Sequence, residues 1–273
     1  MTDPLLTFGV TPFFLHAHPD DESISTGGTI AALLSVGARV TVLTGTRGER
    51  GEVVPGDLHD LEGTDRLGPH RVGELAEALR ELGSPAHAFL GAPPARTALR
   101  SVREYSDSGM RWGDDGFAEA ATDASPTSLS LAPLADVVDD VLAAASDDRP
   151  SAIVSYDALG GYGHPDHVRM HDAGVEAARR LDVPFFAIVE PRVETRDRAG
   201  TQGPAESDII EIDLLGTEAL AAKTRAMAAH RTQLTIDGDA FVLSGGQRHP
   251  IGVTERFRRL FRVPRSRRLD GAG

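Results

Sequence analysis

The chain alternates short apolar runs with longer stretches in which apolar residues recur every three or four positions. Residues 39–43 (RVTVL) alternate and are β-branched, as is typical of a strand. In residues 70–82, Val72, Leu75 and Leu79 recur at helical spacing. Because strands and helices alternate throughout, the pattern predicts an α/β, Rossmann-like fold: a mostly parallel sheet with helices on both faces. The expected strands are 8–17, 39–43, 86–90, 152–155 and 183–189, with an edge strand at 208–214, and the expected helices are 29–36, 70–82, 131–145, 168–181 and 217–233.

One long segment, residues 92–128, has no sustained period and is rich in proline, glycine, serine and aspartate. A loop of that length inside a compact domain is usually functional or disordered. We expect a lid-like insertion or rim over a ligand site; the alternative is a mobile insertion with no role. The basic stretch 262–273 is expected to be a flexible tail. The prediction is therefore a single α/β domain over residues 1–261.

Composition narrows the class of protein. The 273 residues are 40% hydrophobic and 25% charged, which is ordinary for a globular protein. A net charge of −13 argues against a nucleic-acid partner. The absence of cysteine excludes disulfides, thiolate zinc sites and cysteine nucleophiles. The N-terminus lacks the basic region of a signal peptide, and no apolar run approaches the ~20 residues of a membrane span, so we expect a cytoplasmic protein with no membrane partner.

Two short turns carry most of the candidate chemistry. Residues 16–23 (HAHPDDES) follow the apolar run 13–15, and residues 161–167 (GYGHPDH) come after the apolar run 152–154. In open α/β sheets, ligands bind outside the carboxyl ends of strands. A single His-Pro-Asp is usually a turn in which the aspartate caps a helix. Two copies, each after a buried strand, favour two halves of one metal site.

The residue types suit a catalytic metal. His18, Asp21 and His167 are the candidate ligands, because a catalytic zinc commonly takes three His or carboxylate ligands and keeps a fourth position open. Asp20 is adjacent to a ligand but would point elsewhere, so it could take a proton from an activated water. Iron or cobalt would accept the same ligands.

Other polar residues of the two turns receive different interpretations. His164, as an imidazolium, could stabilise a developing oxyanion or protonate a leaving amine, and Tyr162 offers a hydroxyl to the same oxygen. His16 is expected to be a hydrogen-bonded structural residue. His171 is expected to support the site or to be a plain polar residue, since no glutamate follows His167. Glu22 is expected to be a favourable charge at a helix N-terminus.

The pair of turns resembles the PIG-L/LmbE-like family, zinc hydrolases that remove N-acetyl groups from amino sugars. Within it, the segments TRGERGEV, YSDSGM and YDALGGYGHPDH are similar to the branch that deacetylates N-acetylglucosaminyl-inositol in mycothiol biosynthesis. Gly163 favours the deacetylase over the related mycothiol S-conjugate amidase, which has a proline there. The resemblance implies an LmbE-like fold, one Zn²⁺ per chain held by His18, Asp21 and His167, Asp20 as general base, His164 as the imidazole that stabilises the oxyanion, Tyr162 as a mobile tyrosine, and Arg71 and Asp107 as substrate-binding residues.

Several alternatives remain open. The substrate could be another N-acetylated sugar or natural product, or a mycothiol S-conjugate. Two histidines and one carboxylate also define the triad of non-haem iron oxygenases. A non-catalytic carbohydrate-binding protein is a third possibility. In each enzymatic reading the expected partner is a small molecule, and a homo-oligomer is possible.

Overall fold

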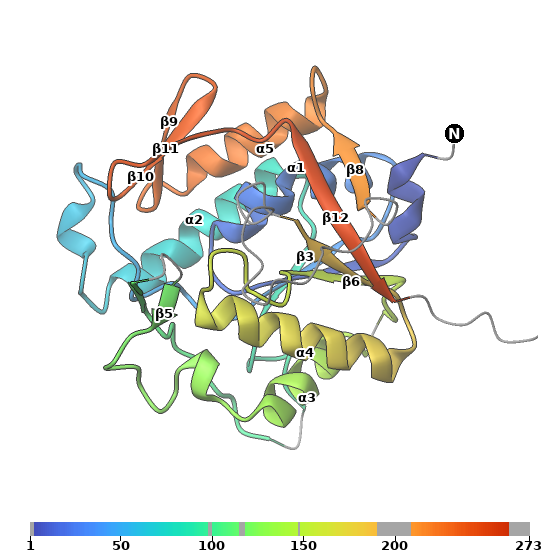
Figure 1. The fold of residues 1–273 in the computed structure, drawn as a ribbon, viewed down its shortest axis with the longest axis horizontal. Coiled ribbons are helices and arrows are strands. Elements are labelled where there is room, and N and C mark those ends of the chain that lie inside the picture. The colour runs from blue at the N-terminus through green and yellow to red at the C-terminus, as the bar shows by residue number, and fades with distance from the viewer. Residues whose placement is uncertain (1–2, 98–99, 115–117, 147, 190–208, 262–273) are drawn as a thin grey trace, which may run out of the picture.

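The computed structural model describes residues 3–97, 100–114, 118–146, 148–189 and 209–261. Its centre is a seven-stranded sheet with the order β3-β2-β1-β6-β7-β12-β8 (Figure 1). The first five strands are parallel, whereas β12 runs antiparallel to both of its neighbours. The strands of this sheet are β1 (Pro12–His16), β2 (Thr41–Thr44), β3 (Ala86–Phe89), β6 (Ala152–Ser155), β7 (Phe185–Ile188), β8 (Ile209–Asp213) and β12 (Thr254–Phe261).

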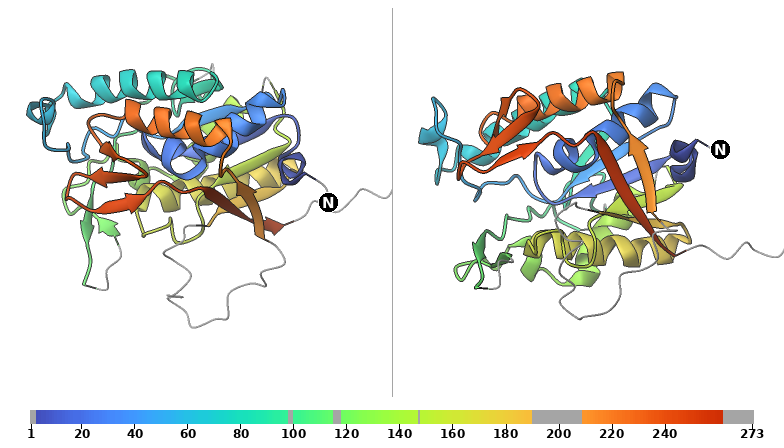
Figure 2. Two further views of the ribbon diagram at one scale, coloured as in Figure 1. Left: turned by 90° about the horizontal axis from the view of Figure 1, so that it is seen from above. Right: turned by 45° about the horizontal axis from the view of Figure 1, so that its top comes forward.

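Helices cover both faces of the sheet, as the alternation of elements predicts (Figure 2). On β1, Phe14 packs with the helices of one face, while Phe13 and Leu15 pack with those of the other, because successive side chains of a strand point to opposite faces. The first face carries α1 (Asp21–Ser35), α2 (Leu67–Glu81) and α5 (Glu218–Ala229), and the second carries α3 (Leu134–Ala144) and α4 (Pro165–Leu181).

Most expected elements are present, with shifted ends. The strand at 152–155 is confirmed to the residue, and the edge strand at 208–214 is β8. The strand expected from residue 8 begins only at Pro12, because residues 4–8 form a short 3-10 helix, η1 (Pro4–Phe8). The helix expected at 29–36 begins eight residues earlier, at Asp21, where serine, threonine and glycine obscure the apolar period. The helix expected to reach residue 233 ends at Ala229.

The last fifty residues hold strands that the pattern does not predict. A three-stranded sheet has the order β11-β10-β9, and β12 completes the main sheet between β7 and β8. β12 has the sequence TERFRRLF, whose charged residues hide its period of two. The small sheet consists of β9 (Leu234–Asp237), β10 (Ala240–Leu243) and β11 (Arg248–Pro250).

The segment 92–128 contains a two-stranded ribbon, β4 (Met110–Trp112) and β5 (Ala118–Ala120). Tyr105 and Ser108 are buried, so this part of the segment packs against the domain. The backbone N–H of Ala118 donates to the carbonyl of Tyr162 at 2.9 Å, which joins the ribbon to the second His-Pro-Asp turn. A role as a lid stays a prediction. Two short 3-10 helices, η2 (His59–Leu61) and η3 (Leu129–Leu131), complete the described elements.

The expected tail, residues 262–273, lies outside the described residues. Among the helices of the described ranges, none has the length and apolar character needed to cross a membrane.

Candidate metal centre

The two His-Pro-Asp turns meet at one edge of the sheet because their strands are neighbours. β1 and β6 are paired in parallel, with Pro12 opposite Ala152 and Phe14 opposite Val154. Their carboxyl ends therefore emerge side by side, and α1 and α4 begin directly after the turns. This is the position where open α/β sheets bind ligands.

Asp21 lies beside both of the histidines that are predicted with it as metal ligands. Asp21 stands between the two imidazoles: its Oδ2 is 3.4 Å from His18 Nδ1 and its Oδ1 is 3.4 Å from His167 Nε2. His167 is 3% exposed, and its Nε2 is buried with no hydrogen-bond partner. A buried ring nitrogen rarely goes unpaired, so this orphaned atom beside a carboxylate fits a bound divalent cation.

The described donor atoms that lie close enough together to share a cation come from a different combination of residues, which does not include Asp21. One group of ligand atoms within 4.8 Å of one another comes from His18, His164 and His167, and a second comes from His18, Asp107, His164 and Asp166. The site could therefore hold a metal with more than one donor set. The described residues alone do not select zinc.

Asp166 is the residue of the second group that most clearly supports a ligand. Its Oδ2 is 3.2 Å from His18 Nε2, and it accepts hydrogen bonds from the backbone N–H and the hydroxyl of Ser108. A carboxylate on the far nitrogen of a metal-binding histidine fixes the ring and its tautomer. Burial alone would lower the pKa of His18, but the carboxylates of Asp107, Asp166 and Asp21 outweigh it and raise this pKa well above 6.5. In the absence of a cation, the imidazole of His18 is therefore protonated, and a bound cation would replace that proton.

Tyr156 supports the other two ligands. Its hydroxyl donates to Asp21 Oδ2 at 2.7 Å and accepts from the N–H of Ala17 at 2.7 Å. Its ring stacks on His167 with centroids 3.9 Å apart and planes 9° apart. Burial would raise the pKa of Asp21, but His167 and His18 hold it well below its usual range. Asp21 is therefore an anion whose two oxygens are directed by its neighbours.

Asp20 occupies the N-cap of α1 in an unusual conformation. Its φ is 108°, in the left-handed region that a non-glycine residue rarely adopts, at a cost of about 1–3 kcal/mol. Its side chain makes no capping hydrogen bond, although aspartate normally caps through its carboxylate. Burial, and then the adjacent charge of Asp21, raise the pKa of Asp20 to about 8. The carboxylate is thus left available as a base.

His164 is the N-cap of α4, and its Nδ1 accepts the N–H of Asp166 at 3.2 Å. A neutral ring then carries its hydrogen on Nε2. Burial, together with the neighbouring His18 and His167, holds the pKa of His164 well below 6.5. The imidazolium predicted from the sequence at this position is therefore replaced by a neutral imidazole at pH 7.

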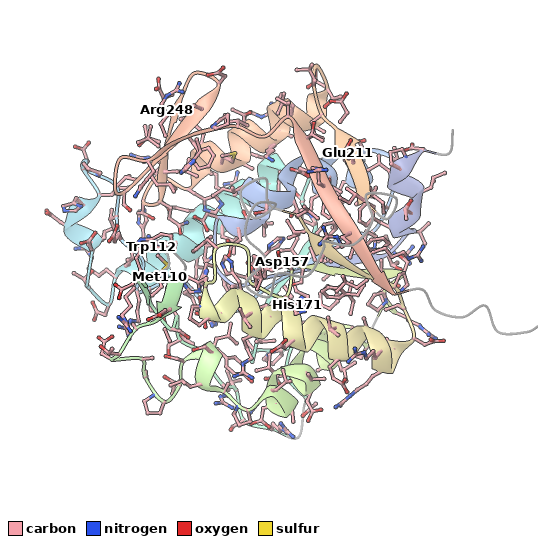
Figure 3. All side chains as sticks on the ribbon, in the orientation of Figure 1. Met110, Trp112, Asp157, His171, Glu211 and Arg248 are labelled. Carbon is pink, nitrogen blue, oxygen red and sulfur yellow. The ribbon has the colours of Figure 1, made fainter. Side chains whose placement is uncertain are left out.

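Tyr162 stands at the solvent side of the site and is 43% exposed. Its ring centroid lies 5.3 Å from that of His167 and 5.9 Å from that of Trp112. Trp112, labelled with Met110 in Figure 3, comes from β4 and is 59% exposed. The ribbon of segment 92–128 therefore places an aromatic side chain beside the second turn.

The two predicted substrate-binding residues lie at different places. Asp107 is near the ligands, with Oδ1 3.8 Å from His18 Nε2. Arg71 is 3% exposed and braces the loop after β2: its guanidinium donates to the carbonyls of Gly48 and Glu52 and to the hydroxyl of Thr232. These three hydrogen bonds use three of the five N–H groups of the guanidinium.

A cavity of about 620 Å³ lies beside the loop that Arg71 braces. None of the candidate metal ligands lines it; Glu49, which does, accepts the backbone N–H of Asp107 at 2.8 Å. Seven of the thirteen residues that line it are charged: Arg47, Glu49, Arg50, Glu52, Glu62, Asp65 and Glu104.

Three residues interpreted as structural can be placed. His16 is fully buried with Nε2 3.0 Å from the hydroxyl of Thr26, and His171 bonds the carbonyl of Tyr156 through Nδ1 at 2.8 Å. Neither belongs to the groups that could hold a metal. Glu22 is in the first turn of α1, as expected, but it is fully buried and bonds His230 rather than facing solvent.

Sequence reasoning assigned no role to four residues of this region. Tyr156 follows β6 directly, so the rule that singled out the two turns could have found it. Asp166 is the aspartate of the second His-Pro-Asp. Ser108 lies in the segment YSDSGM, but its contact with Asp166 depends on the fold, and His230 reaches the site from a distant segment.

Comparison with known proteins gives a consistent picture. The model of the PIG-L family, described as GlcNAc-PI de-N-acetylase, matches residues 13–178. A 1D-myo-inositol 2-acetamido-2-deoxy-alpha-D-glucopyranoside deacetylase of Saccharomonospora viridis is 38% identical over 264 residues, covering 89% of this chain and 92% of the relative. A protein of the same name from Kineococcus radiotolerans is 39% identical over 281 residues, covering 90% and 76%.

Solved structures share the fold. A deacetylase of the teicoplanin biosynthesis pathway, in complex with teicoplanin, has a TM-score of 0.60 at 20% identity and covers 91% of this chain and 97% of its own. The N,N'-diacetylchitobiose deacetylase of Pyrococcus horikoshii has a TM-score of 0.52 at 20% identity, covering 84% and 73%. With the family model matching more than half of the chain, this protein belongs to the PIG-L family of de-N-acetylases.

Proposed function

We propose that this protein is a zinc-dependent hydrolase that removes the N-acetyl group of an amino sugar, with N-acetylglucosaminyl-inositol as its substrate. The observation that carries the proposal is the position of Asp21, 3.4 Å from a ring nitrogen of His18 and 3.4 Å from the orphaned Nε2 of His167. The adjacent carboxylate of Asp20 supplies a base that is not needed as a ligand. The curated relatives named above support the choice of substrate.

The reaction divides between the two turns. His18, Asp21 and His167 would hold the cation, which when bound polarises an acetyl carbonyl and lowers the pKa of water. Asp20 accepts the proton of the attacking water, and its high pKa suits a base that must later release that proton. His164 donates its Nε2 hydrogen, either to the developing oxyanion or to the leaving nitrogen. Tyr162 offers its hydroxyl from the solvent side.

The rest of the substrate would extend toward Asp107 and the cavity that Glu49 lines. Asp107 and Arg71 are positioned near the loop of residues 47–52, where charge-assisted hydrogen bonds could orient hydroxyl groups. Their contact with substrate is part of the proposal. A polyol such as inositol matches the hydrogen-bonding character of the cavity wall.

The test is acetate release from a panel of substrates. Purified protein, stripped of metal and reloaded with Zn²⁺, Fe²⁺ or Co²⁺, is offered N-acetylglucosaminyl-inositol, N-acetylglucosamine, N,N'-diacetylchitobiose and a mycothiol S-conjugate. We expect the highest kcat/KM for the inositol compound and no turnover after metal removal. Preference for another member of the panel would contradict the proposed substrate, and turnover unaffected by chelation would contradict the metal chemistry.

Two variants separate binding of the metal from chemistry. His18→Ala should lose both bound metal and turnover. Asp20→Asn should keep the metal and lose roughly 10²- to 10⁴-fold in kcat, the usual contribution of a general base. Full activity of Asp20→Asn would show that another group accepts the proton.

A further inference from the structure

A buried pair next to the site has no part in the chemistry above. Glu22, in the first turn of α1, and His230, at the end of α5, are both fully buried. Glu22 Oε1 lies 2.8 Å from His230 Nε2. Burial of such a pair gives little net stability, because the loss of hydration offsets the attraction. The presence of the buried pair of Glu22 and His230 therefore calls for a role other than stabilising the fold.

Glu22 connects this pair to Asp20. Its second oxygen, Oε2, accepts the backbone N–H of Asp20 at 3.0 Å. The first oxygen also accepts the hydroxyl of Ser23 at 2.5 Å, so the carboxylate is held on both sides. Asp20 has a φ of 108° and no capping bond from its own side chain. The backbone N–H of Asp20, a residue in a strained conformation, is therefore bound by the carboxylate of Glu22.

His230 in turn fixes Glu22 from the other end of the chain. Its Nδ1 is 3.3 Å from Gln233 Nε2, and its Nε2 is also 3.3 Å from the hydroxyl of Ser23. α5 packs along α1, so the imidazole reaches the first turn of α1 from a rigid helix. The contact between Glu22 and His230 therefore connects the turn that carries Asp20 to the end of α5, across 208 residues of sequence.

We propose that Glu22 and His230 are positioning residues that hold Asp20 in its left-handed conformation, with the carboxylate free to act as the base. The proposal rests on the proposed function, because it assigns that role to Asp20. Without the pair, Asp20 would relax toward an ordinary N-cap, in which its own carboxylate bonds the backbone N–H groups of α1. The carboxylate would then be occupied and turned away from the reacting water.

The chain offers a matched control. Lys223 and Glu255 form a second buried pair, 2.7 Å apart, and Glu255 accepts the backbone N–H groups of Gly28 and Thr29. Like the first pair it ties α5 to α1, yet none of its hydrogen bonds or ion pairs within the described residues involves Asp20. Lys223→Met should reproduce any general loss of stability without affecting the base.

The kinetic test compares Glu22→Leu, His230→Phe and Lys223→Met with the wild type. Misplacing a catalytic group by about 1 Å costs on the order of 100-fold, so we expect kcat to fall roughly 10- to 100-fold in the first two variants, with KM and bound metal nearly unchanged. Glu22→Gln keeps an acceptor oxygen for the Asp20 N–H and should recover most of kcat. Equal losses in Lys223→Met and His230→Phe would overturn the proposal, as would unchanged kcat in Glu22→Leu.

A second readout does not depend on turnover. Hydrogen exchange of the Asp20 amide, followed by NMR in the metal-free protein, should be at least about tenfold faster in Glu22→Leu than in wild type or Lys223→Met. Unchanged protection would overturn the proposal. Were the wild type to release no acetate from any substrate, the proposed function would fail, while the exchange result would still decide whether the pair fixes Asp20. His230→Gln replaces His230→Phe if the latter does not fold.

Discussion

At the scale of single residues, Asp20 shows how a site can cost stability. Its carboxyl is forced toward the neutral form by burial and by the charge of Asp21, and its backbone is strained. Both features suit a base that must accept and release a proton near neutral pH. The same features should make the metal-free protein less stable than the variant Asp20→Asn, in which residue 20 cannot carry a charge.

This trade-off predicts a specific pH dependence. The pKa of Asp20 is about 8 in the folded protein and about 3.9 in an unfolded chain, so the folded state binds the proton more tightly. The stability this gives is fully present below pH ~4 and is lost as the pH rises through about 8. In metal-free protein, Tm should therefore fall between pH 6 and pH 9 by roughly 5 °C more in wild type than in Asp20→Asn. Thermal scans of both proteins in matched buffers measure this difference; parallel curves would contradict the raised pKa.

His87 predicts the opposite dependence, away from the site. Burial lowers the pKa of its imidazole to about 4, and its Nε2 is 3.1 Å from the hydroxyl of Thr44. Here the unfolded chain binds the proton more tightly, so the contribution is present above pH ~6.5 and is lost as the pH falls toward 4. The loss should reach about 3 kcal/mol at pH 4. Urea unfolding at pH 7 and pH 4.5 should show a smaller decrease for His87→Gln than for wild type.

At the scale of elements, helix α1 is tightly packed where it must carry Asp20 and Asp21. Gly28 lies so close to Leu214, the residue after β8, that an added Cβ would be 2.1 Å from Leu214 Cδ1. The two glycines of this helix weaken its apolar period, so the sequence pattern predicts a helix that starts too late. For Gly28, the close approach of Leu214 explains why a glycine is needed.

Two helical glycines provide a matched pair for this idea. Gly28→Ala should destabilise the protein by about 1–3 kcal/mol through overpacking. Gly73→Ala, in α2, has no atom within 4 Å of the new Cβ and should stabilise it by roughly 0.5–1 kcal/mol through helix propensity. Chemical denaturation of both variants measures the two changes. A stabilised Gly28→Ala would mean that α1 and the segment after β8 can separate easily.

The β4–β5 ribbon offers a direct probe of ligand binding. Trp112 is the only tryptophan of the chain, is 59% exposed and lies 5.9 Å from the ring of Tyr162. A sugar bound at the metal centre should shield this indole and shift its emission to shorter wavelength. The experiment uses metal-loaded Asp20→Asn, to prevent turnover, with N-acetylglucosaminyl-inositol as titrant. Unchanged emission at saturating ligand would show that the ribbon does not cover the bound substrate.

At the scale of the whole molecule, the candidate metal centre links two parts of the chain. Two of the predicted ligands, His18 and Asp21, come from the turn after β1, and the third, His167, comes from the start of α4, almost 150 residues later. A cation that binds only the folded protein stabilises it by RT ln(1 + [M]/Kd), about 2.7 kcal/mol at 100 times Kd. Metal binding should therefore stabilise the whole folded protein in addition to supporting catalysis.

Metal removal tests this prediction. Chelation followed by dialysis should lower Tm by roughly 5–10 °C, and readdition of Zn²⁺ should restore it. His167→Ala should show no response to Zn²⁺, whereas Lys223→Met should respond like wild type. A Tm that is indifferent to metal in the wild type would argue that His18, Asp21 and His167 do not form the site.

How much of the fold and of the candidate site could be predicted from the sequence differs between residues. The apolar runs before His16 and Tyr156 predict two buried strands, and their pairing places the two turns together. By contrast, the arginines of β12 interrupt its alternation of apolar and polar residues, so the sequence pattern does not predict this strand. His230 carries no local mark of its contact with Glu22, because that contact depends on the packing of α5 against α1.

The order of residues by itself determined the α/β class, the two histidine-rich turns and the identity of the candidate ligands, because these depend on local period and on residue type. Only the tertiary structure decided the strained backbone of Asp20, the stacking of Tyr156 on His167, the neutral state of His164 and the scaffolding use of Arg71. Each of these depends on burial or on a neighbour far away in the chain, and neither is encoded in a short stretch of sequence.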